Sequence, residues 1–301
     1  MPHAIQPPLA PVGASAGPAT GEPAARSPGA YAPVNGLEIY YETHDPEHSP
    51  ENDPVTSAHP PLILLHGGVG GIEMFGPNLP ALATTRRVIA VELQGHGRTA
   101  DIDRPLRYEL MADDVAALIT HLGLTTVDVM GYSLGGGVAV QTAIRHPDAV
   151  RKLVVVSAAC RRAAFYPEVL ATMDRLGPAF GDGMKKSPLA TRYPAIDWPT
   201  LFGKLGDLLR QPYDWSADVA ALRPQTMLVY ADADSVQLSS IVEFYRLLGG
   251  GQRDGGLDGS GRAAARLAIV PGATHYDLLS TSVVAELVRP FLDAPLPAAS
   301  R

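Results

Sequence analysis

The stretch Thr126-Val-Asp-Val-Met-Gly-Tyr-Ser-Leu-Gly-Gly-Gly137 decides how this 301-residue chain is interpreted. Its first half is a short apolar run typical of a buried strand, and its second half opens a helical segment that ends before Pro147. Between them, the pattern Gly-x-Ser-x-Gly puts Ser133 on a sharp strand-to-helix turn, where small neighbours avoid striking the strand and the helix. Such a turn exposes the hydroxyl at a helix N-terminus, which favours developing negative charge. We therefore expect Ser133 to be a nucleophile.

Short apolar runs and amphipathic segments alternate on both sides of this turn. This alternation predicts an α/β fold, with a mostly parallel, doubly wound sheet and helices on both of its faces. An early strand or hairpin at 37–42 follows the turn signal Asn35-Gly36 and is expected at the sheet edge. The strands predicted after it are 62–65, 87–91, 126–130, 152–156, 226–230 and 266–270, and the helices are 106–122, 138–145, 238–248 and 280–292.

One interval, residues 161–223, interrupts the alternation and is rich in proline and aromatic residues. We predict that it forms a small helical cap inserted into a single core domain made of residues 31–160 and 224–293. Residues 1–30 are dominated by Pro, Ala and Gly, which cannot build a packed element, so they are predicted to be a disordered tail. Residues 294–301 are expected to be a flexible C-terminus.

The composition excludes several classes of protein. Apolar residues make up 46% of the chain and charged residues 18%, enough for a buried core. A formal charge of -7 argues against nucleic acid or an anionic membrane as a partner. No apolar run reaches the about 18 residues of a spanning helix, and no basic-then-apolar signal opens the chain, so a cytoplasmic location is expected. The single Cys160 excludes an internal disulfide, and the histidines show no metal-binding spacing.

A serine hydroxyl becomes a good nucleophile only when a base takes its proton and a carboxylate fixes the tautomer of that base. Among nine histidines, His275 ends the turn Pro271-Gly-Ala-Thr-His275 that directly follows the predicted strand 266–270. It would therefore lie at the carboxyl end of a strand, where the sites of open α/β sheets are found. His66 and His96 also lie near strand ends, but both precede the serine and are predicted to shape loops.

The carboxylate should come from Ala231-Asp-Ala-Asp234, which follows the predicted strand 226–230. Asp232 and Asp234 are both candidates. We choose Asp234, because Asp232 lies nearer the strand end, where an aspartate usually serves the turn through bonds to the backbone. The resulting chain order of serine, aspartate and histidine is the one expected for a nucleophile on this kind of turn.

An oxyanion hole requires two preorganised N–H donors. We expect one from Leu134, the residue after the nucleophile, and the other from Gly68 in the glycine-rich loop that follows the first parallel strand. This loop lacks the Lys-[Ser/Thr] of a P-loop and the Gly-x-Gly-x-x-Gly order of a dinucleotide site, so we do not predict a phosphate cradle.

Taken together, these motifs resemble those of the α/β-hydrolase superfamily, over roughly residues 31–293. They are Leu65-His-Gly-Gly68, Glu92-Leu-Gln-Gly-His-Gly-Arg-Thr99, Gly131-Tyr-Ser-Leu-Gly-Gly136, Ala231-Asp-Ala-Asp234 and Pro271-Gly-Ala-Thr-His275. The resemblance implies that Asp234 rather than Asp232 is the acid, and that neither a metal nor an organic cofactor is needed.

The chain departs from the superfamily pattern in two places. Glu92 and Gln94 stand where the superfamily more often has aspartate and arginine, which is expected to alter local hydrogen bonding. The glycine-rich segment 249–261 is longer than the usual connection and is predicted to be a mobile surface loop near the site.

Aromatic residues are concentrated in the predicted cap, which suggests an apolar lid over a small-molecule pocket. They could equally form the cap's own core. The rings expected to line the pocket are Phe165, Tyr166, Trp198 and Trp215.

The expected activity is that of a carboxylesterase-like serine hydrolase, which cleaves an ester of a small or medium apolar substrate through an acyl-enzyme. Haloalkane dehalogenases and epoxide hydrolases have a similar layout but use an aspartate nucleophile, so Ser133 argues against both. Three alternatives stay open: a C–C bond hydrolase, a cofactor-free perhydrolase, and a non-catalytic ligand-binding protein on the same fold. The sequence indicates no oligomeric state.

Overall fold

The computed structural model describes residues 29–46 and 59–296. Residues 1–28 of the predicted N-terminal tail and 297–301 of the predicted C-terminus therefore lie outside the described residues. Within them, eight strands form one sheet in the order β1-β2-β4-β3-β5-β6-β7-β8. β1 and β2 form an antiparallel hairpin at one edge, and β2 pairs antiparallel with β4. The other pairings are parallel, which confirms the predicted sheet. The strands are β1 (Ala30–Val34), β2 (Leu37–His44), β3 (Leu62–Leu65), β4 (Val88–Val91), β5 (Val127–Tyr132), β6 (Val150–Val156), β7 (Gln225–Ala233) and β8 (Arg266–Thr274).

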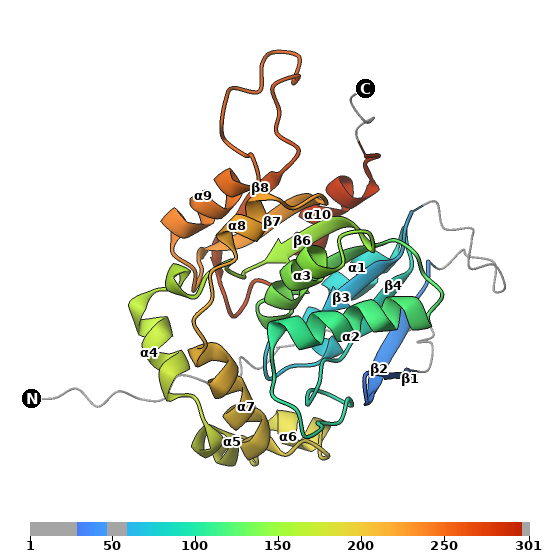
Figure 1. Ribbon diagram of the computed structural model, residues 1–301, viewed down its shortest axis with the longest axis vertical. Coiled ribbons are helices and arrows are strands. Elements are labelled where there is room, and N and C mark those ends of the chain that lie inside the picture. Colours follow the sequence, from blue (N-terminus) through green and yellow to red (C-terminus); the bar gives the residue numbers. More distant parts are fainter. Residues whose placement is uncertain (1–28, 47–58, 297–301) are drawn as a thin grey trace, which may run out of the picture.

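Helices cover both faces of this sheet (Figure 1). Along β5, Val129 points into one cluster of buried apolar side chains and Met130 into the other, because successive side chains of a strand point to opposite faces. The Val129 face is covered by α2 (Tyr108–His121), α3 (Leu134–Arg145) and α9 (Leu238–Leu247), and the Met130 face by α1 (Asn78–Ala83) and α10 (Val283–Asp293). This two-sided cover is the predicted doubly wound architecture.

Two elements between β3 and β4 were not predicted. They are the short 3-10 helix η1 (Ile72–Phe75) and α1. A helix of one or two turns is too short to show an apolar period in the sequence, so the pattern gave no signal for either. No helix in the described ranges is both long and apolar enough to cross a membrane.

The interval between β6 and β7, which the sequence assigns to a cap, is helical. It holds η2 (Arg162–Ala164), α4 (Pro167–Arg175), α5 (Pro178–Met184), α6 (Pro188–Arg192), α7 (Trp198–Arg210) and α8 (Ser216–Ala220). α4 to α7 lie together at the lower left of Figure 1, and α5 and α4 both pack on α7. α8 instead packs on α3 and α9, so the last part of the interval rests on the core domain.

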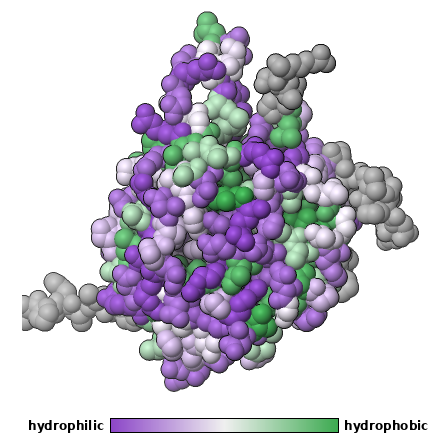
Figure 2. Space-filling model, viewed as in Figure 1, coloured by the Kyte–Doolittle hydropathy of each residue, from purple (hydrophilic) through white to green (hydrophobic). Residues whose placement is uncertain are grey.

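The glycine-rich segment 249–261 does not lie near the carboxyl ends of the strands, contrary to expectation. It joins α9 to the amino end of β8 and projects at the top of Figure 1, away from the cap helices. Because β8 runs parallel to β7, its amino end lies at the opposite edge of the sheet from Asp234 and His275. Figure 2 shows that this projection is mainly hydrophilic with an apolar tip, and Leu257 within it is exposed.

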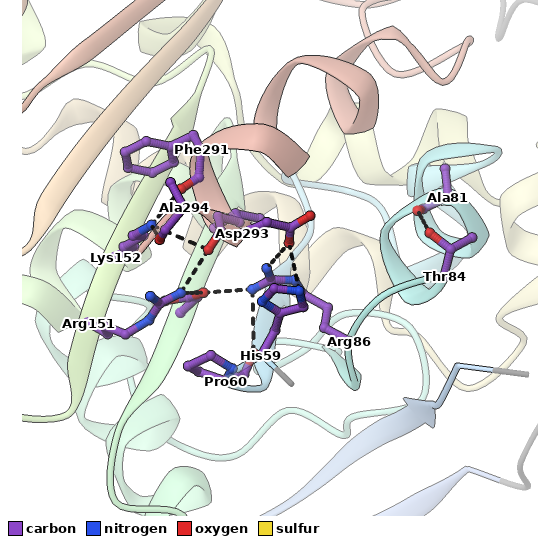
Figure 3. Close-up of polar contacts among 12 residues, drawn as sticks. His59, Pro60, Ala81, Thr84, Arg86, Arg151, Lys152, Phe291, Asp293 and Ala294 are labelled. Atoms are coloured by element: carbon purple, nitrogen blue, oxygen red, sulfur yellow. Dashed lines mark hydrogen bonds and ion pairs between the residues drawn. The ribbon is translucent and has the colours of Figure 1, made fainter. Parts of the chain in front are cut away.

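A buried charged cluster lies at the amino ends of β5 and β6 (Figure 3). Arg86 and Asp128 are both fully buried, and Arg86 Nη1 donates to Asp128 Oδ2 at 2.7 Å. Arg151 donates two further bonds to the same carboxylate, at 2.9 and 2.6 Å. Arg86 also pairs with Asp293, the last residue of α10. The cluster therefore ties the sheet to the end of the final helix.

Lys152 holds the end of α10 in a second way. Its buried ammonium donates to the carbonyl oxygens of Phe291 at 2.6 Å, of Leu292 at 3.3 Å, and of Ala294. The last carbonyls of a helix have no partner within the helix and carry partial negative charge, so a cation is well suited to them. These contacts lie at the edge of the sheet opposite the carboxyl strand ends, which makes the cluster a structural one.

Replacing Arg86 with leucine is expected to lower the free energy of unfolding by about 3 kcal/mol, because it removes one partner of a carboxylate that stays buried. Urea unfolding followed by circular dichroism measures the change. The matched control is Arg87→Leu, which breaks the partly exposed pair with Asp45 and is expected to cost under about 1 kcal/mol. Equal losses in the two variants would contradict the structural role of the buried cluster.

Candidate active site

Ser133 stands between the end of β5 and the start of α3 with a φ of 53°, a left-handed backbone conformation that side chains other than glycine rarely adopt. Its neighbours leave no room for a side chain. A Cβ on Gly131 would lie 2.0 Å from the carbonyl oxygen of Gly135, and one on Gly135 would lie 2.3 Å from that of Leu65. The Gly-x-Ser-x-Gly pattern thus follows from close approach of strand and helix. α3 begins at Leu134, earlier than the predicted 138. The glycines of its first turn have a low helix propensity, so the sequence did not predict this turn, but packing overrides that propensity.

The three side chains predicted to act together are brought together at the carboxyl ends of β5, β7 and β8. Ser133 Oγ lies 3.1 Å from His275 Nε2, and His275 Nδ1 lies 3.3 Å from Asp234 Oδ1. The Asp234 side chain is 1% exposed and that of His275 is 12% exposed. The histidine ring therefore lies between the hydroxyl and a buried carboxylate, the arrangement in which it can take a proton from the serine.

The turn that carries His275 is held at both ends. Asp277 Oδ1 accepts bonds from the backbone N–H of Thr274 at 2.6 Å and from its hydroxyl at 2.9 Å. The Tyr132 hydroxyl donates to the carbonyl oxygen of His275, and the two rings stack with their centroids 5.4 Å apart. Tyr132 directly precedes Ser133, so one residue fixes the histidine backbone relative to the serine.

The structure separates the two candidate aspartates. Asp234 faces the histidine, whereas Asp232 is exposed and accepts the backbone N–H of Gly272 at 2.9 Å. Burial acts to raise the pKa of Asp234, but hydrogen bonds from His275, from the Ser157 hydroxyl and from the Ala231 N–H outweigh it and lower the pKa. The Asp234 carboxylate is therefore ionised near neutral pH and suited to orient a histidine.

Gly68 and Leu134, the two predicted oxyanion donors, are neighbours in space. A Cβ added to Gly68 would lie 3.9 Å from the Leu134 Cβ. The loop that carries Gly68 is attached to the start of α3, because the Gly135 N–H donates to the carbonyl oxygen of His66 at 3.1 Å. His66 Nε2 accepts the backbone N–H of Leu93 at 3.1 Å, and burial lowers the pKa of His66 to about 3. His66 is thus a neutral residue that shapes the loop, as the sequence predicts.

Glu92 and Gln94, which depart from the superfamily pattern, each form a distinct network. The buried Glu92 carboxylate accepts from Arg98 Nη1 at 2.6 Å and from the Arg98 backbone N–H at 2.5 Å. Gln94 donates to Asp101 at 2.8 Å and accepts from Arg104 at 2.9 Å, a dual role that an arginine side chain cannot fill. The altered residues are therefore fully engaged in hydrogen bonds on this side of the site.

The four aromatic residues expected in the pocket have different surroundings. Phe165 pairs as an isolated β-bridge with Val236, and the Tyr166 N–H donates to the carbonyl oxygen of Ser235 at 3.2 Å, so both lie beside the loop that carries Asp234. Trp215 is buried and stacks on Tyr213, with ring centroids 4.4 Å apart. Trp198 begins α7 and is 3% exposed. The two tryptophans thus belong to the packed core of this region.

A link between the helical interval 161–223 and the segment after Gly68 was not predicted. Tyr193 directly follows α6, and its hydroxyl donates to the Glu73 carboxylate. Glu73 lies in η1, directly after the loop that carries Gly68. Arg98 joins the same carboxylate at 2.5 Å. Tyr193 is 3% exposed. No local pattern marks such a pair, because its members are far apart in the chain.

Changing Tyr193 to phenylalanine is expected to lower the free energy of unfolding by about 1 kcal/mol, since the partly buried Glu73 carboxylate loses a donor. Because Glu73 directly follows the loop that carries Gly68, the rate of any reaction at Ser133 that depends on this loop is expected to fall several-fold as well. Thermal unfolding and initial rates measure the two effects. Tyr31→Phe, at an exposed tyrosine, is the control and should change neither. A Tyr193→Phe protein with unchanged stability and rate would show that this hydrogen bond contributes to neither.

Within residues 29–46 and 59–296, no group of three or more His, Cys, Asp or Glu side chains is arranged to hold a metal ion. Cys160 is buried, and burial raises the pKa of its thiol to about 11, so it remains a neutral thiol.

Comparison with known proteins agrees with this fold. A family model described as the alpha/beta hydrolase fold matches residues 60–253. The chain therefore belongs to the α/β-hydrolase fold family. A relative from Neisseria meningitidis serogroup C, named pimeloyl-[acyl-carrier protein] methyl ester esterase, is 42% identical over 122 residues. The matched segment is 40% of this chain and 44% of that relative, so it spans less than half of the relative's length.

Solved structures share the fold at lower identity. The enol-lactonase from Burkholderia xenovorans LB400 superposes with a TM-score of 0.67 at 20% identity, covering 88% of this chain and 100% of that one. A meta-cleavage product hydrolase from Pseudomonas fluorescens IP01 superposes with a TM-score of 0.64 at 19% identity, covering 89% and 98%. At these identities the likeness concerns the fold alone.

Proposed function

We propose that this chain is a serine hydrolase that cleaves a carboxylic ester of a small or medium apolar substrate through an acyl-enzyme intermediate. The observation that carries the proposal is the 3.1 Å contact between Ser133 Oγ and His275 Nε2, with the buried Asp234 behind the imidazole ring. A bacterial relative that is named a methyl ester esterase supports the same type of reaction.

In the proposed reaction, Ser133 Oγ attacks the ester carbonyl carbon while His275 Nε2 takes the hydroxyl proton. The negative charge that forms on the carbonyl oxygen is received by the N–H groups of Gly68 and Leu134, the latter at the N-terminus of α3. Protonated His275 then gives its proton to the leaving alkoxide, which departs as an alcohol. Water then attacks the acyl carbon while His275 takes its proton, and His275 returns this proton to Ser133 Oγ as the bond to the acyl group breaks and the carboxylic acid is released.

The expected substrate class rests on the side chains near the loop that carries Asp234. Phe165 is buried beside Val236, and the ring of Tyr166 is partly exposed. Leu205 of α7 lies close to Gly68, within 3.9 Å of a Cβ built on that glycine. An apolar acyl or alcohol group suits such surroundings, because burying it gains about 0.8 kcal/mol per CH₂.

The test is a panel of p-nitrophenyl esters from acetyl to octanoyl, run beside labelling by a fluorophosphonate and mapping of the labelled residue. We expect label on Ser133 and turnover that is highest for short or medium acyl chains. Label on Ser133 without turnover of any ester would reject the ester proposal while keeping the nucleophile. Decay of a coloured dienone-acid substrate under the same conditions would then identify a C–C bond hydrolase.

A further inference from the structure

The Asp234 carboxylate is held by two serine hydroxyls that the proposed reaction does not use. Ser157 directly follows β6 with a φ of 50°, and its hydroxyl donates to Asp234 Oδ2 at 2.5 Å. The hydroxyl of Ser235 lies 3.3 Å from Asp234 Oδ1. Both serines are buried, at 1% and 7% exposure. Two backbone N–H groups complete the set, those of Ala231 at 3.1 Å and Val236 at 3.3 Å.

The two serines differ in what else they touch. Ser235 Oγ lies 3.0 Å from His275 Nδ1, closer than the 3.3 Å between that nitrogen and Asp234 Oδ1. The Ser157 hydroxyl donates to the other carboxylate oxygen, Oδ2, and not to the oxygen that is paired with the ring. When Nδ1 carries its hydrogen, Ser235 Oγ can accept it and turn its own hydrogen toward Asp234. Ser235 thus bridges the carboxylate and the imidazole.

We propose that Ser235 is a positioning residue of the hydrolase proposed above: its hydroxyl gives His275 Nδ1–H a second acceptor and passes the interaction on to Asp234. The inference rests on the proposed function for its catalytic consequence. The hydroxyl acts through the histidine, since it has no contact with Ser133 Oγ and takes no part in bond making. Its role is to hold the ring in one orientation while Nε2 receives and returns the serine proton.

Removing each serine should shift the protonation of His275 in opposite directions. Without Ser235, Nδ1–H keeps only the carboxylate at 3.3 Å, longer than the 2.9–3.0 Å typical of N–H···O bonds, so the imidazolium is less stabilised. Without Ser157, the carboxylate loses a donor, carries more charge toward the ring, and stabilises the imidazolium more. The imidazolium becomes less stable only when the hydroxyl that is removed contacts the ring itself.

Other groups around His275 are the same in both variants. Tyr132 stacks on the ring, the ring of Tyr276 meets it edge-on with centroids 5.3 Å apart, and Asp277 closes the turn beneath it. None of them bonds to either serine. A difference between the two variants therefore reports the two hydroxyls.

The experiment compares the pH dependence of kcat/KM in wild type, Ser235→Ala, Ser157→Ala and Ser235→Thr, with a p-nitrophenyl ester as the probe. For Ser235→Ala we expect kcat to fall about tenfold with KM within about twofold, and the acid limb to move down by about 0.5 pH unit. Ser235→Thr, which keeps the hydroxyl, should restore most of the loss. Ser157→Ala should move the acid limb to higher pH. Movement of the Ser235→Ala limb upward, or no movement, would overturn the proposal.

A second readout needs no turnover. The ring nitrogen resonances of His275, assigned by their absence in His275→Gln, are followed against pH in ¹⁵N-histidine-labelled protein. The same opposite shifts are expected, so an inactive wild type would reject the esterase proposal and still decide the role of Ser235. If Ser235→Ala does not fold, Ser235→Cys keeps the volume with a much weaker hydrogen-bonding group and should shift the titration in the same direction.

Discussion

Replacing Ser133 with alanine is expected to lower kcat for the best ester of the panel by about 10⁴- to 10⁶-fold, while the protein stays folded. The hydroxyl is the only group of this residue that meets His275, at 3.1 Å, and without it no acyl-enzyme can form. Initial rates and fluorophosphonate labelling measure the loss. Stability should not fall, because the turn is kept and, among the described residues, the histidine is the one side chain whose hydrogen bond to this hydroxyl is lost.

The control for this change is Ser239→Ala, which removes an exposed hydroxyl on α9 and should leave the rate unaltered. A Ser133→Ala protein that retains more than about a tenth of the wild-type rate would show that the reaction does not pass through this serine. If the chain's cellular role survived intact in that variant, the role would be one of binding rather than catalysis.

Changing Asp234 to asparagine is expected to reduce kcat by about 10³- to 10⁴-fold, since an amide can present its NH₂ to Nδ1 and thereby favour the wrong histidine tautomer. Five groups around this carboxylate donate hydrogen bonds to its ionised oxygens. In asparagine one of the two oxygens becomes an NH₂ group, which cannot accept these bonds. The pH profile of kcat/KM and the rate at its plateau are the measurements.

Asp232→Asn is the matched control for Asp234→Asn, two residues away on the same turn. Its carboxylate is exposed and accepts the Gly272 N–H, so we expect less than about a threefold change in rate. Equal losses in the two variants, or a larger loss at Asp232, would move the role of the acid from Asp234 to its neighbour.

Ser133 and His275 could be predicted from the sequence because each follows a short apolar run directly. The carboxyl ends of parallel strands meet at one edge of a sheet, so residues placed there come together whatever the length of chain between them. The hairpin at Asn35-Gly36 was predictable for a local reason as well, since both residues adopt the positive φ that its turn demands, 48° and 84°.

The sequence favoured Asp234 over Asp232 only through the usual role of an aspartate beside a strand end, and the tertiary structure supplies the geometric reason. The pairing register of β7 and β8 is irregular here. Ala231 pairs with Val270 and Ala233 with Thr274, so β8 has two more residues than β7 between these two pairs. Gly272, with a φ of 71°, lies in the resulting bulge and bonds to Asp232. That irregularity turns Asp232 to the outside and leaves Asp234 facing the histidine.

From the sequence alone, the alternation of the main strands and helices, the turn that exposes Ser133 and the strand end that carries His275 could be predicted, because these depend on residues adjacent in the chain. The contact of Asp234 with His275, and the position of Ser157 and Ser235 around the carboxylate, became known only from the tertiary structure. Ser157, Asp234 and His275 lie at the carboxyl ends of three different strands, β6, β7 and β8. Their geometry depends on register and on the space between packed elements, which no local pattern encodes.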